Sequence, residues 1–271
     1  MTTLADSGML DLGPETLEYR MIGLRPDAAP TLVLLHEGLG CVDMWNHFPD
    51  QLAAATGCGV FVYSRAGYGR SSPVTLPRPL TYMHHEANNV LPRVLERIGF
   101  QRGLLVGHSD GASIATIYAG SHQDHRVRGL VLMAPHFIVE DISVASIAEA
   151  REAYNNGDLR ARLSKYHPNV DVAFRGWNDV WLENDFRQWD ISEALAYIRV
   201  PILIVQGEDD QYGTIRQIEI AQEECYCPVD VALLPGVKHN PAREAAEVTL
   251  RTVTEFVTRI VRGHEAEASA A

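Results

Sequence analysis

Six short runs of apolar, often β-branched residues, bounded by Gly or Pro, recur along this chain of 271 residues. None of them alternates apolar with polar residues, which is typical of strands buried on both faces of a mostly parallel sheet. Apolar stripes at helical spacing occur at 90–98 and at 253–261. The alternation predicts an α/β fold, with a mostly parallel central sheet and helices on both faces. The predicted strands are 31–35, 59–63, 103–106, 129–133, 201–205 and 229–234.

The alternation stops between residues 136 and 199, where no strand-like run occurs. Aromatic residues crowd the amphipathic segments there: Tyr154, Tyr166, Phe174, Trp177, Trp181, Phe186 and Trp189. We therefore expect a core of 1–135 and 200–263, a helical cap or lid inserted at 136–199, and a flexible tail at 264–271. The alternative is a helical appendage whose aromatic side chains pack only on one another.

The charge balance limits the partners of the chain. Asp and Glu number 35 against 23 Lys and Arg, which leaves a net charge of −12, the wrong sign for binding phosphate backbones. No apolar stretch approaches the roughly 18 residues that a membrane span requires, and the first residues lack the apolar core of a secretion signal. We expect a cytoplasmic protein that binds a small molecule and neither nucleic acid nor membrane; a homodimer is compatible with the sequence.

Metal and cofactor signatures are weak. The four cysteines are too sparse for a disulfide scaffold, so free thiols are expected. Residues 84–86, His-His-Glu, have no third ligand at suitable spacing and are expected on a solvated face. Neither of the glycine-rich patterns that cradle nucleotide phosphates is present. The sequence therefore predicts no metal and no organic cofactor. The cysteines are Cys41, Cys58, Cys225 and Cys227.

The strongest chemical signal is Gly107-His108-Ser109-Asp110-Gly111, which follows one predicted strand and precedes a helical run. This pattern is typical of a sharp strand-to-helix turn that holds a serine in a strained conformation, and the turn needs residues without side chains two before and two after the serine. The helix amino terminus then favours negative charge beside Ser109. A serine hydroxyl is a weak nucleophile until a base takes its proton, so a histidine and an orienting acid must lie elsewhere in the chain.

With this motif the chain resembles the α/β-hydrolase superfamily, from about residue 31 to residue 261, including the order serine, acid, histidine. The resemblance implies an acid after a late strand in the pattern G-x-x-D, which selects Asp210 within Gly207-Glu208-Asp209-Asp210. Asp209 is the alternative after a shift of one residue, and Glu140 or Asp141 after placement behind the preceding strand. The base should follow the last strand, where His239 is expected, with a plain loop histidine as the alternative.

Acyl transfer also needs backbone N–H donors for the oxygen of the tetrahedral intermediate. The resemblance assigns one donor to Asp110, the residue after the nucleophile, and the other to Gly38, because His36-Glu37-Gly38-Leu39-Gly40 is similar to the H-G-G-x-G segment of the family. Glu37 stands where that segment has glycine. If the Glu37 and Asp110 carboxylates face the pocket, they favour neutral or cationic substrates; alternatively, both side chains turn away into hydrogen bonds.

Together these residues predict a serine hydrolase that cleaves a small carboxylic ester or lactone through an acyl-enzyme on Ser109, with the aromatic insertion enclosing the substrate. Hydrolysis of carbon–carbon bonds in ring-fission products, or of thioesters, is the alternative chemistry that the same superfamily hosts. A ligand receptor on a hydrolase fold is the alternative from another class of protein. The residues expected to contact the substrate are Glu37, His136, Phe137, Trp177 and Trp181.

Overall fold

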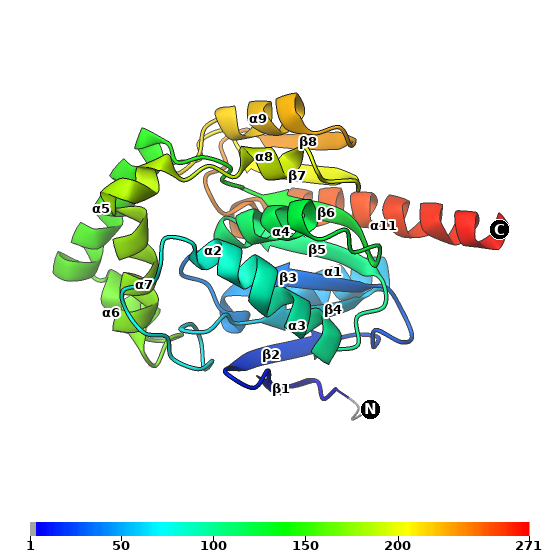
Figure 1. Cartoon of the computed structure of the whole chain (residues 1–271), viewed down its shortest axis with the longest axis horizontal. Helices are drawn as coiled ribbons and strands as arrows, with labels where there is room; N and C mark the ends of the chain where they lie inside the picture. The colour runs from blue at the N-terminus through cyan, green and yellow to red at the C-terminus, as the bar shows by residue number, and fades with distance from the viewer. Residues whose placement is uncertain (1–3, 271) are drawn as a thin grey trace.

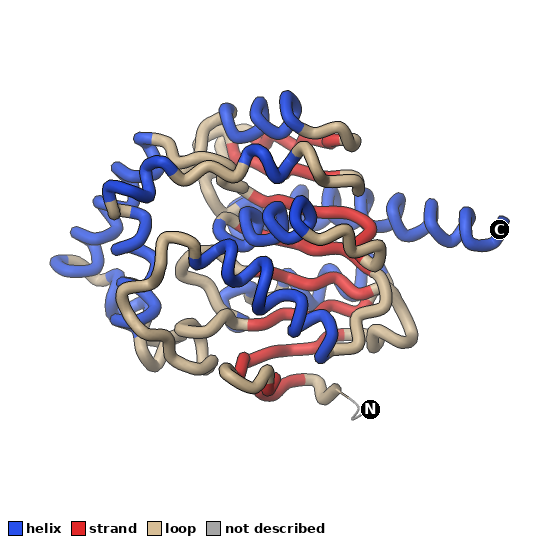
Figure 2. Tube along the Cα trace, viewed as in Figure 1, coloured by secondary structure: helices blue, strands red, loops and turns tan. Residues whose placement is uncertain are grey.

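The computed structural model describes residues 4–270, and for 264–270 it describes the backbone alone. One sheet of eight strands runs through the molecule in the order β1-β2-β4-β3-β5-β6-β7-β8 (Figures 1 and 2). Its bounds are β1 Ser7–Asp11, β2 Thr16–Ile22, β3 Thr31–Leu35, β4 Gly59–Tyr63, β5 Gly103–His108, β6 Val127–Met133, β7 Ile202–Gly207 and β8 Val229–Leu234. Strands β3 to β8 pair in parallel, and the β1–β2 and β2–β4 pairs are antiparallel. The predicted mostly parallel sheet is confirmed.

All six predicted strands are present, and the two antiparallel strands β1 and β2 were not predicted. A signal for β2 was available, because Leu17, Tyr19 and Met21 are apolar at every second position and are buried. The polar residues between them interrupt the run, so β2 lacks the continuous apolar stretch that marks the six predicted strands.

Helices cover both faces of the sheet, which confirms the predicted layers. Helices α1 (Phe48–Thr56) and α11 (Ala246–Ala270) lie on one face, and α3 (Leu91–Arg97), α4 (Asp110–Ser121) and α9 (Arg216–Glu224) on the other (Figure 1). Side chains of β3 alternate between two apolar cores: Leu32 and Leu34 pack with α1 and α11, and Val33 and Leu35 with the opposite layer. Both faces of the strand are apolar because both are buried.

The segment between β6 and β7 contains helices and no strand, and its helices α5, α6 and α7 lie together beyond one end of the sheet (Figure 1). Its two stems are joined by an antiparallel bridge between Ile138 and Asp190. The last helix, α8, leaves this group: a Cβ on Gly120 of α4 would lie 2.5 Å from the carbonyl oxygen of Ala194. We call residues 139–189 the cap. Its helices are α5 Asp141–Asn156, α6 Leu159–Leu163, α7 Val170–Trp181 and η3 Asn184–Gln188, followed by α8 Ser192–Leu195.

The remaining short helices lie at the loops that carry the site or beside them: η1 Val42–Trp45, α2 Tyr82–His85, η2 Glu86–Val90 and α10 Pro241–Glu244. At the end of the chain α11 continues to Ala270, where a flexible tail was expected from 264 onward. Alanine and glutamate are strong helix formers, which favours this continuation. Residue 271 of that predicted tail lies outside the described residues. None of the helices described between residues 4 and 270 is long and apolar enough to cross a membrane.

Candidate active site

Ser109 occupies a strained turn between β5 and α4. Its backbone has φ 51° and ψ −119°, in the left-handed region that residues with a side chain rarely adopt. The turn needs its two glycines: a Cβ on Gly107 would lie 2.4 Å from the carbonyl oxygen of Gly111, and a Cβ on Gly111 would lie 2.0 Å from that of Leu35. The close approach of Gly111 to Leu35 seats the turn against the end of β3, so Ser109 lies beside the loop that begins at His36.

Three side chains far apart in the sequence form one chain of hydrogen bonds. His239 Nε2 lies 2.9 Å from Ser109 Oγ, and His239 Nδ1 lies 2.9 Å from each carboxylate oxygen of Asp210. Because an ionised carboxylate only accepts, Nδ1 carries the proton and Nε2 is free to accept that of the serine hydroxyl. We call these three residues the triad.

Asp210 is anchored as an ionised acceptor. Its carboxylate accepts hydrogen bonds from the Tyr212 N–H at 2.8 Å and from Gln206 Nε2 at 2.7 Å. Burial alone would raise the pKa of Asp210, but His239 and the Tyr212 N–H outweigh it and hold the pKa below its usual value. The carboxylate therefore stays charged and can stabilise an imidazolium at His239.

The alternative acids lie elsewhere. Asp209 is exposed. Glu140 accepts hydrogen bonds from the backbone and the hydroxyl of Thr214, and Asp141, with a side chain 99% exposed, pairs with Arg187. Of these four carboxylates, only that of Asp210 reaches His239.

Gly38 and Asp110 lie on the two segments that meet at Ser109. Asp110 is the first residue of α4, so its N–H is one of the amides that a helix leaves without an internal acceptor. The orientation of the Gly38 N–H is fixed through its own peptide plane, because the carbonyl oxygen of Glu37 accepts hydrogen bonds from His36 Nδ1 at 2.7 Å and from Arg65 Nη2 at 3.1 Å. In a trans peptide the N–H points away from that carbonyl. Both amides are thus held in set directions.

Arg65 joins these two segments from below. Its buried guanidinium also donates to the carbonyl of His36 and lies 3.7 Å from the Asp110 carboxylate. The Asp110 carboxylate accepts a hydrogen bond from the Tyr82 hydroxyl at 2.5 Å and has no exposed side-chain area. Burial raises its pKa, although Arg65 and Tyr82 partly offset this. Of the two orientations left open for the Asp110 side chain, the structure has the one that turns away into hydrogen bonds, because its carboxylate lies in this buried network.

Glu37 has a partner that sequence reasoning missed. Its carboxylate, 21% exposed, lies 3.6 Å from His108 Nδ1. Burial would lower the pKa of His108, but Glu37 and the carbonyl of His239 outweigh it and raise the pKa; His108 in turn lowers the pKa of Glu37, against the effect of burial. The other ring nitrogen of His108 donates to the carbonyl of His239 at 2.7 Å. The pair thus compensates the Glu37 charge and holds the backbone of the triad histidine.

The predicted substrate contacts differ in exposure. The His136 ring is 2% exposed and packs 5.1 Å from the Trp181 ring and 5.5 Å from that of His239, and Trp177 covers Gly38. Phe137 is completely buried in the apolar core, and Trp181 is 1% exposed in the same core. Ser109 retains 6% exposure and the His239 side chain 13%, so little of the triad is accessible to solvent.

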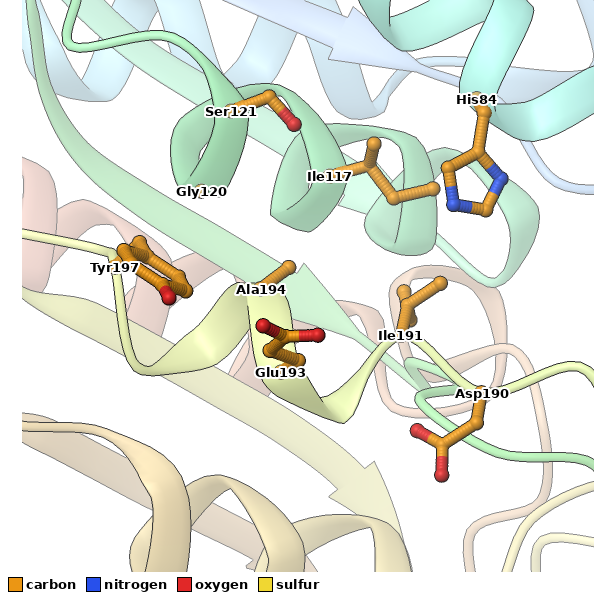
Figure 3. A pocket seen from close by; sticks show the side chains of 9 residues that line it. All are labelled: His84, Ile117, Gly120, Ser121, Asp190, Ile191, Glu193, Ala194 and Tyr197. Carbon is orange, nitrogen blue, oxygen red and sulfur yellow. The ribbon is translucent and has the colours of Figure 1, made fainter.

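A separate depression of about 370 Å³ lies between α4 and α8 (Figure 3). Its lining includes Ile117, Asp190 and Tyr197, and none of the triad residues.

Within the described residues, no group of three or more His, Cys, Asp or Glu could hold a metal ion. Glu86, which was expected on a solvated face, is 4% exposed instead, because it is enclosed with the Arg65 and Arg78 guanidinium groups.

Two residues of the cap, His167 and Trp181, make contacts with the core that the sequence did not predict. His167 donates from Nε2 to the carbonyl of Leu39 at 2.9 Å and accepts from the Gly69 N–H at 2.9 Å. Trp181 Nε1 donates to the Tyr82 hydroxyl at 3.2 Å. Neither residue belongs to a motif, and only the crowding of aromatic residues in the insertion gave any signal.

Comparisons with known proteins agree with this architecture. Residues 30–165 match the α/β hydrolase fold family. Proline iminopeptidase of Lactobacillus delbrueckii subsp. bulgaricus is 33% identical over 229 residues, which cover 70% of this chain and 77% of that protein. The bifunctional esterase/perhydrolase DCH of Acinetobacter calcoaceticus is 26% identical over 230 residues, which cover 74% of this chain and 82% of that protein.

Solved structures share the same fold. The crystal structure of VinJ superposes with a TM-score of 0.76 at 19% identity and covers 94% of this chain and 99% of VinJ. At this identity the likeness concerns the fold alone. From the family match, the topology of the sheet and the relatives in sequence, this chain belongs to the α/β hydrolase fold family.

Proposed function

We propose that this protein is a serine hydrolase that cleaves a small carboxylic ester or lactone through an acyl-enzyme on Ser109. The observation that carries the proposal is the unbroken chain of hydrogen bonds from Ser109 through His239 to Asp210, each link 2.9 Å long. A hydroxyl held in a strained turn, beside a neutral imidazole whose other nitrogen is bound to a carboxylate, is the arrangement that nucleophilic acyl transfer requires.

The reaction follows from these contacts. Ser109 Oγ attacks the acyl carbonyl carbon while His239 Nε2 takes the hydroxyl proton, and Asp210 stabilises the imidazolium that results. The carbonyl oxygen becomes an oxyanion that the N–H groups of Gly38 and Asp110 stabilise, and one such donor is worth about 3 kcal/mol of barrier. The intermediate collapses, the bond to the leaving group breaks, and His239 protonates that group. Water, deprotonated by His239, then releases the acyl group from Ser109.

The surroundings of the triad favour a small acyl group. Ser109 is only 6% exposed, and the tryptophan-bearing helix α7 packs over Gly38. We propose that the cap acts as a lid that encloses the substrate, because ligand pockets are lined mainly by apolar and aromatic side chains of the kind that the cap supplies. The likeness to the esterase/perhydrolase of Acinetobacter calcoaceticus supports an ester substrate.

A second candidate is cleavage of peptide amides, which the 33% identity to a proline iminopeptidase favours. Amides and esters pass through the same kind of tetrahedral intermediate, so the triad serves both reactions. The proposal ranks small esters and lactones above peptides because Ser109 is only 6% exposed, which favours a small substrate.

The test is mass spectrometry of the intact protein after exposure to a fluorophosphonate, together with turnover of p-nitrophenyl acetate, a lactone, a thioester, a ring-fission product and proline p-nitroanilide. We expect one phosphonyl adduct on Ser109 and fastest turnover of the ester or lactone. Ser109→Ala should lose adduct and turnover with an unchanged melting temperature, while Ser121→Ala, an exposed serine on the same helix, should keep both. Ligand binding without any adduct would instead indicate a receptor, and faster cleavage of the anilide would indicate a peptidase.

A further inference from the structure

The cap contacts both segments that carry the proposed oxyanion amides, and its contact with the first is direct. A Cβ built on Gly38 would lie 2.3 Å from both Cδ1 and Nε1 of Trp177, so the indole rests on the Gly38 backbone. Both residues are well packed, with Trp177 only 7% exposed. A shift of this part of α7 would therefore remove the wall against which Gly38 is seated.

His167 makes a second contact with the same loop. Its Nε2–H donates to the carbonyl of Leu39, one residue beyond Gly38, and its Nδ1 accepts from the Gly69 N–H in the core. These two partners fix one neutral tautomer of the imidazole. His167 is 1% exposed, and burial lowers its pKa, in agreement with a neutral ring. The cap thus ties the loop after β3 to a second core loop.

The cap contacts the segment of the other amide, that of Asp110, through two successive hydrogen bonds, which we call the relay. Trp181 Nε1 donates to the Tyr82 hydroxyl at 3.2 Å, and that hydroxyl donates to the Asp110 carboxylate at 2.5 Å. All three groups are buried, with exposures of 1%, 3% and 0%. Because Asp110 is the first residue of α4, an anchor on its side chain also anchors its backbone N–H.

Trp177 and Trp181 are four residues apart on α7, so they lie on the same face of that helix, one turn apart. One face of one cap helix therefore contacts both segments: Trp177 the first, directly, and Trp181 the second, through Tyr82. Gly176, on the same helix, lies close to the buried Arg78, which donates to the carbonyl of Ala66 in the core. This packing holds α7 against the core.

We propose that the cap sets the geometry of the oxyanion hole, with His167, Trp177 and Trp181 as positioning residues that act on the amides of Gly38 and Asp110. The inference rests on the proposed acyl transfer and goes beyond it, since it gives the cap a part in stabilising the transition state as well as in enclosing the substrate. An amide that is held in place before the reaction stabilises the oxyanion without reorganisation, and an amide that is displaced loses part of that effect.

The experiment compares two variants that break the relay. Tyr82→Phe removes the hydroxyl and with it both hydrogen bonds, and Trp181→Phe removes only the bond from the indole N–H to Tyr82. Tyr154→Phe is the matched control, because the Tyr154 hydroxyl donates to Asp171 within the cap. The measurements are kcat and KM for p-nitrophenyl acetate and inhibition by butylboronic acid, which forms an anionic tetrahedral adduct on an activated serine.

We expect Tyr82→Phe and Trp181→Phe each to lower kcat by about tenfold, with KM within about twofold of wild type, and to weaken boronate inhibition by the same factor as kcat. Tyr154→Phe should match wild type. Tyr82→Phe deletes a single oxygen atom, so it carries the test even if the change at Trp181 impairs folding.

Two results would overturn the inference, and they are distinct from failure of the proposed function. If wild type turns over the ester and both relay variants behave like Tyr154→Phe, the cap does not position the Asp110 amide and the inference as stated fails, while the hydrolase proposal stands. If the variants change KM alone and leave boronate inhibition intact, the relay shapes only the substrate pocket. Absence of turnover and of the fluorophosphonate adduct in wild type would reject both proposals together.

Discussion

His136 should make the protein lose stability on mild acidification. Its ring is 2% exposed and lies among the rings of Trp181 and His239. Burial, followed by the neighbouring His239, lowers the pKa of His136 to about 3 from the ordinary value of 6.5. Below pH 6.5 the His136 imidazole is therefore protonated in the unfolded chain and stays neutral in the folded protein. The stabilisation is complete above about pH 6.5 and is lost as the pH falls toward about 3.

The magnitude follows from linkage. Between pH 7.5 and 5.5 the unfolded imidazole becomes protonated while the folded one stays neutral, and one pH unit below 6.5 corresponds to about 1.4 kcal/mol. The full difference of 3.5 pH units from 6.5 to about 3 corresponds to about 5 kcal/mol on the same scale. The pKa values of His36 and His167 are also lowered by burial, so the same sign applies to them and the wild-type loss contains more than one contribution.

The assay is urea unfolding at pH 7.5 and pH 5.5 of wild type, His136→Gln and His125→Gln. The His125 side chain is exposed, which makes it the matched histidine control. The free energy of unfolding that wild type loses between the two pH values should shrink by about 1.4 kcal/mol in His136→Gln and stay unchanged in His125→Gln. An equal loss in wild type and His136→Gln would refute the reasoning, whatever the stability of the variant at pH 7.5.

Two further substitutions test the triad and the turn. Asp210→Asn should lower kcat for p-nitrophenyl acetate by about 10³- to 10⁴-fold, because the amide no longer holds the imidazole in its catalytic tautomer. Asp209→Asn, at the exposed neighbour, should change kcat by less than twofold, and equal effects of the two substitutions would reject Asp210 as the orienting acid. Gly111→Ala should lower the free energy of unfolding by about 3 kcal/mol or more, because its Cβ would lie 2.0 Å from the Leu35 carbonyl oxygen. The control in urea unfolding is Gly263→Ala, whose Cβ meets no atom within 4 Å, and a Gly111→Ala protein as stable as that control would contradict the turn geometry.

The parts of the site that follow strand ends could be predicted from the sequence. Ser109, Asp210 and His239 each lie a few residues beyond a strand that the apolar runs identify. In a parallel sheet the carboxyl ends of the strands meet at one edge, so a local pattern at each end is enough to bring the three together. The turn at Ser109 is also visible in the sequence, because its two glycines stand at fixed positions, although the contact that requires Gly111 is with the distant Leu35 carbonyl.

The contacts between cap and core could not be predicted in this way. Trp181 and Tyr82 are 99 positions apart, and His167 and Leu39 are 128 apart. Neither pair has a spacing rule, because the packing of the aromatic face of the cap decides where the cap lies beyond the end of the sheet. The direction of a side chain also depends on residues far away in the sequence. The Asp110 carboxylate points inward because Tyr82 and Arg65 lie beside it, and the motif Gly107–Gly111 contains neither residue.

Glu37 shows how a residue that departs from the family pattern is accommodated. In the loop that carries Gly38, the His36 ring and the Arg65 guanidinium bind the carbonyl oxygen of Glu37. These contacts involve only the backbone of Glu37. The side chain is then free to leave the loop and meet His108, whose opposite nitrogen binds the carbonyl of His239. Since Glu37 lies on the same loop as Gly38 and its side chain reaches the loop of the triad histidine through His108, the glutamate connects two loops in a way that a glycine could not.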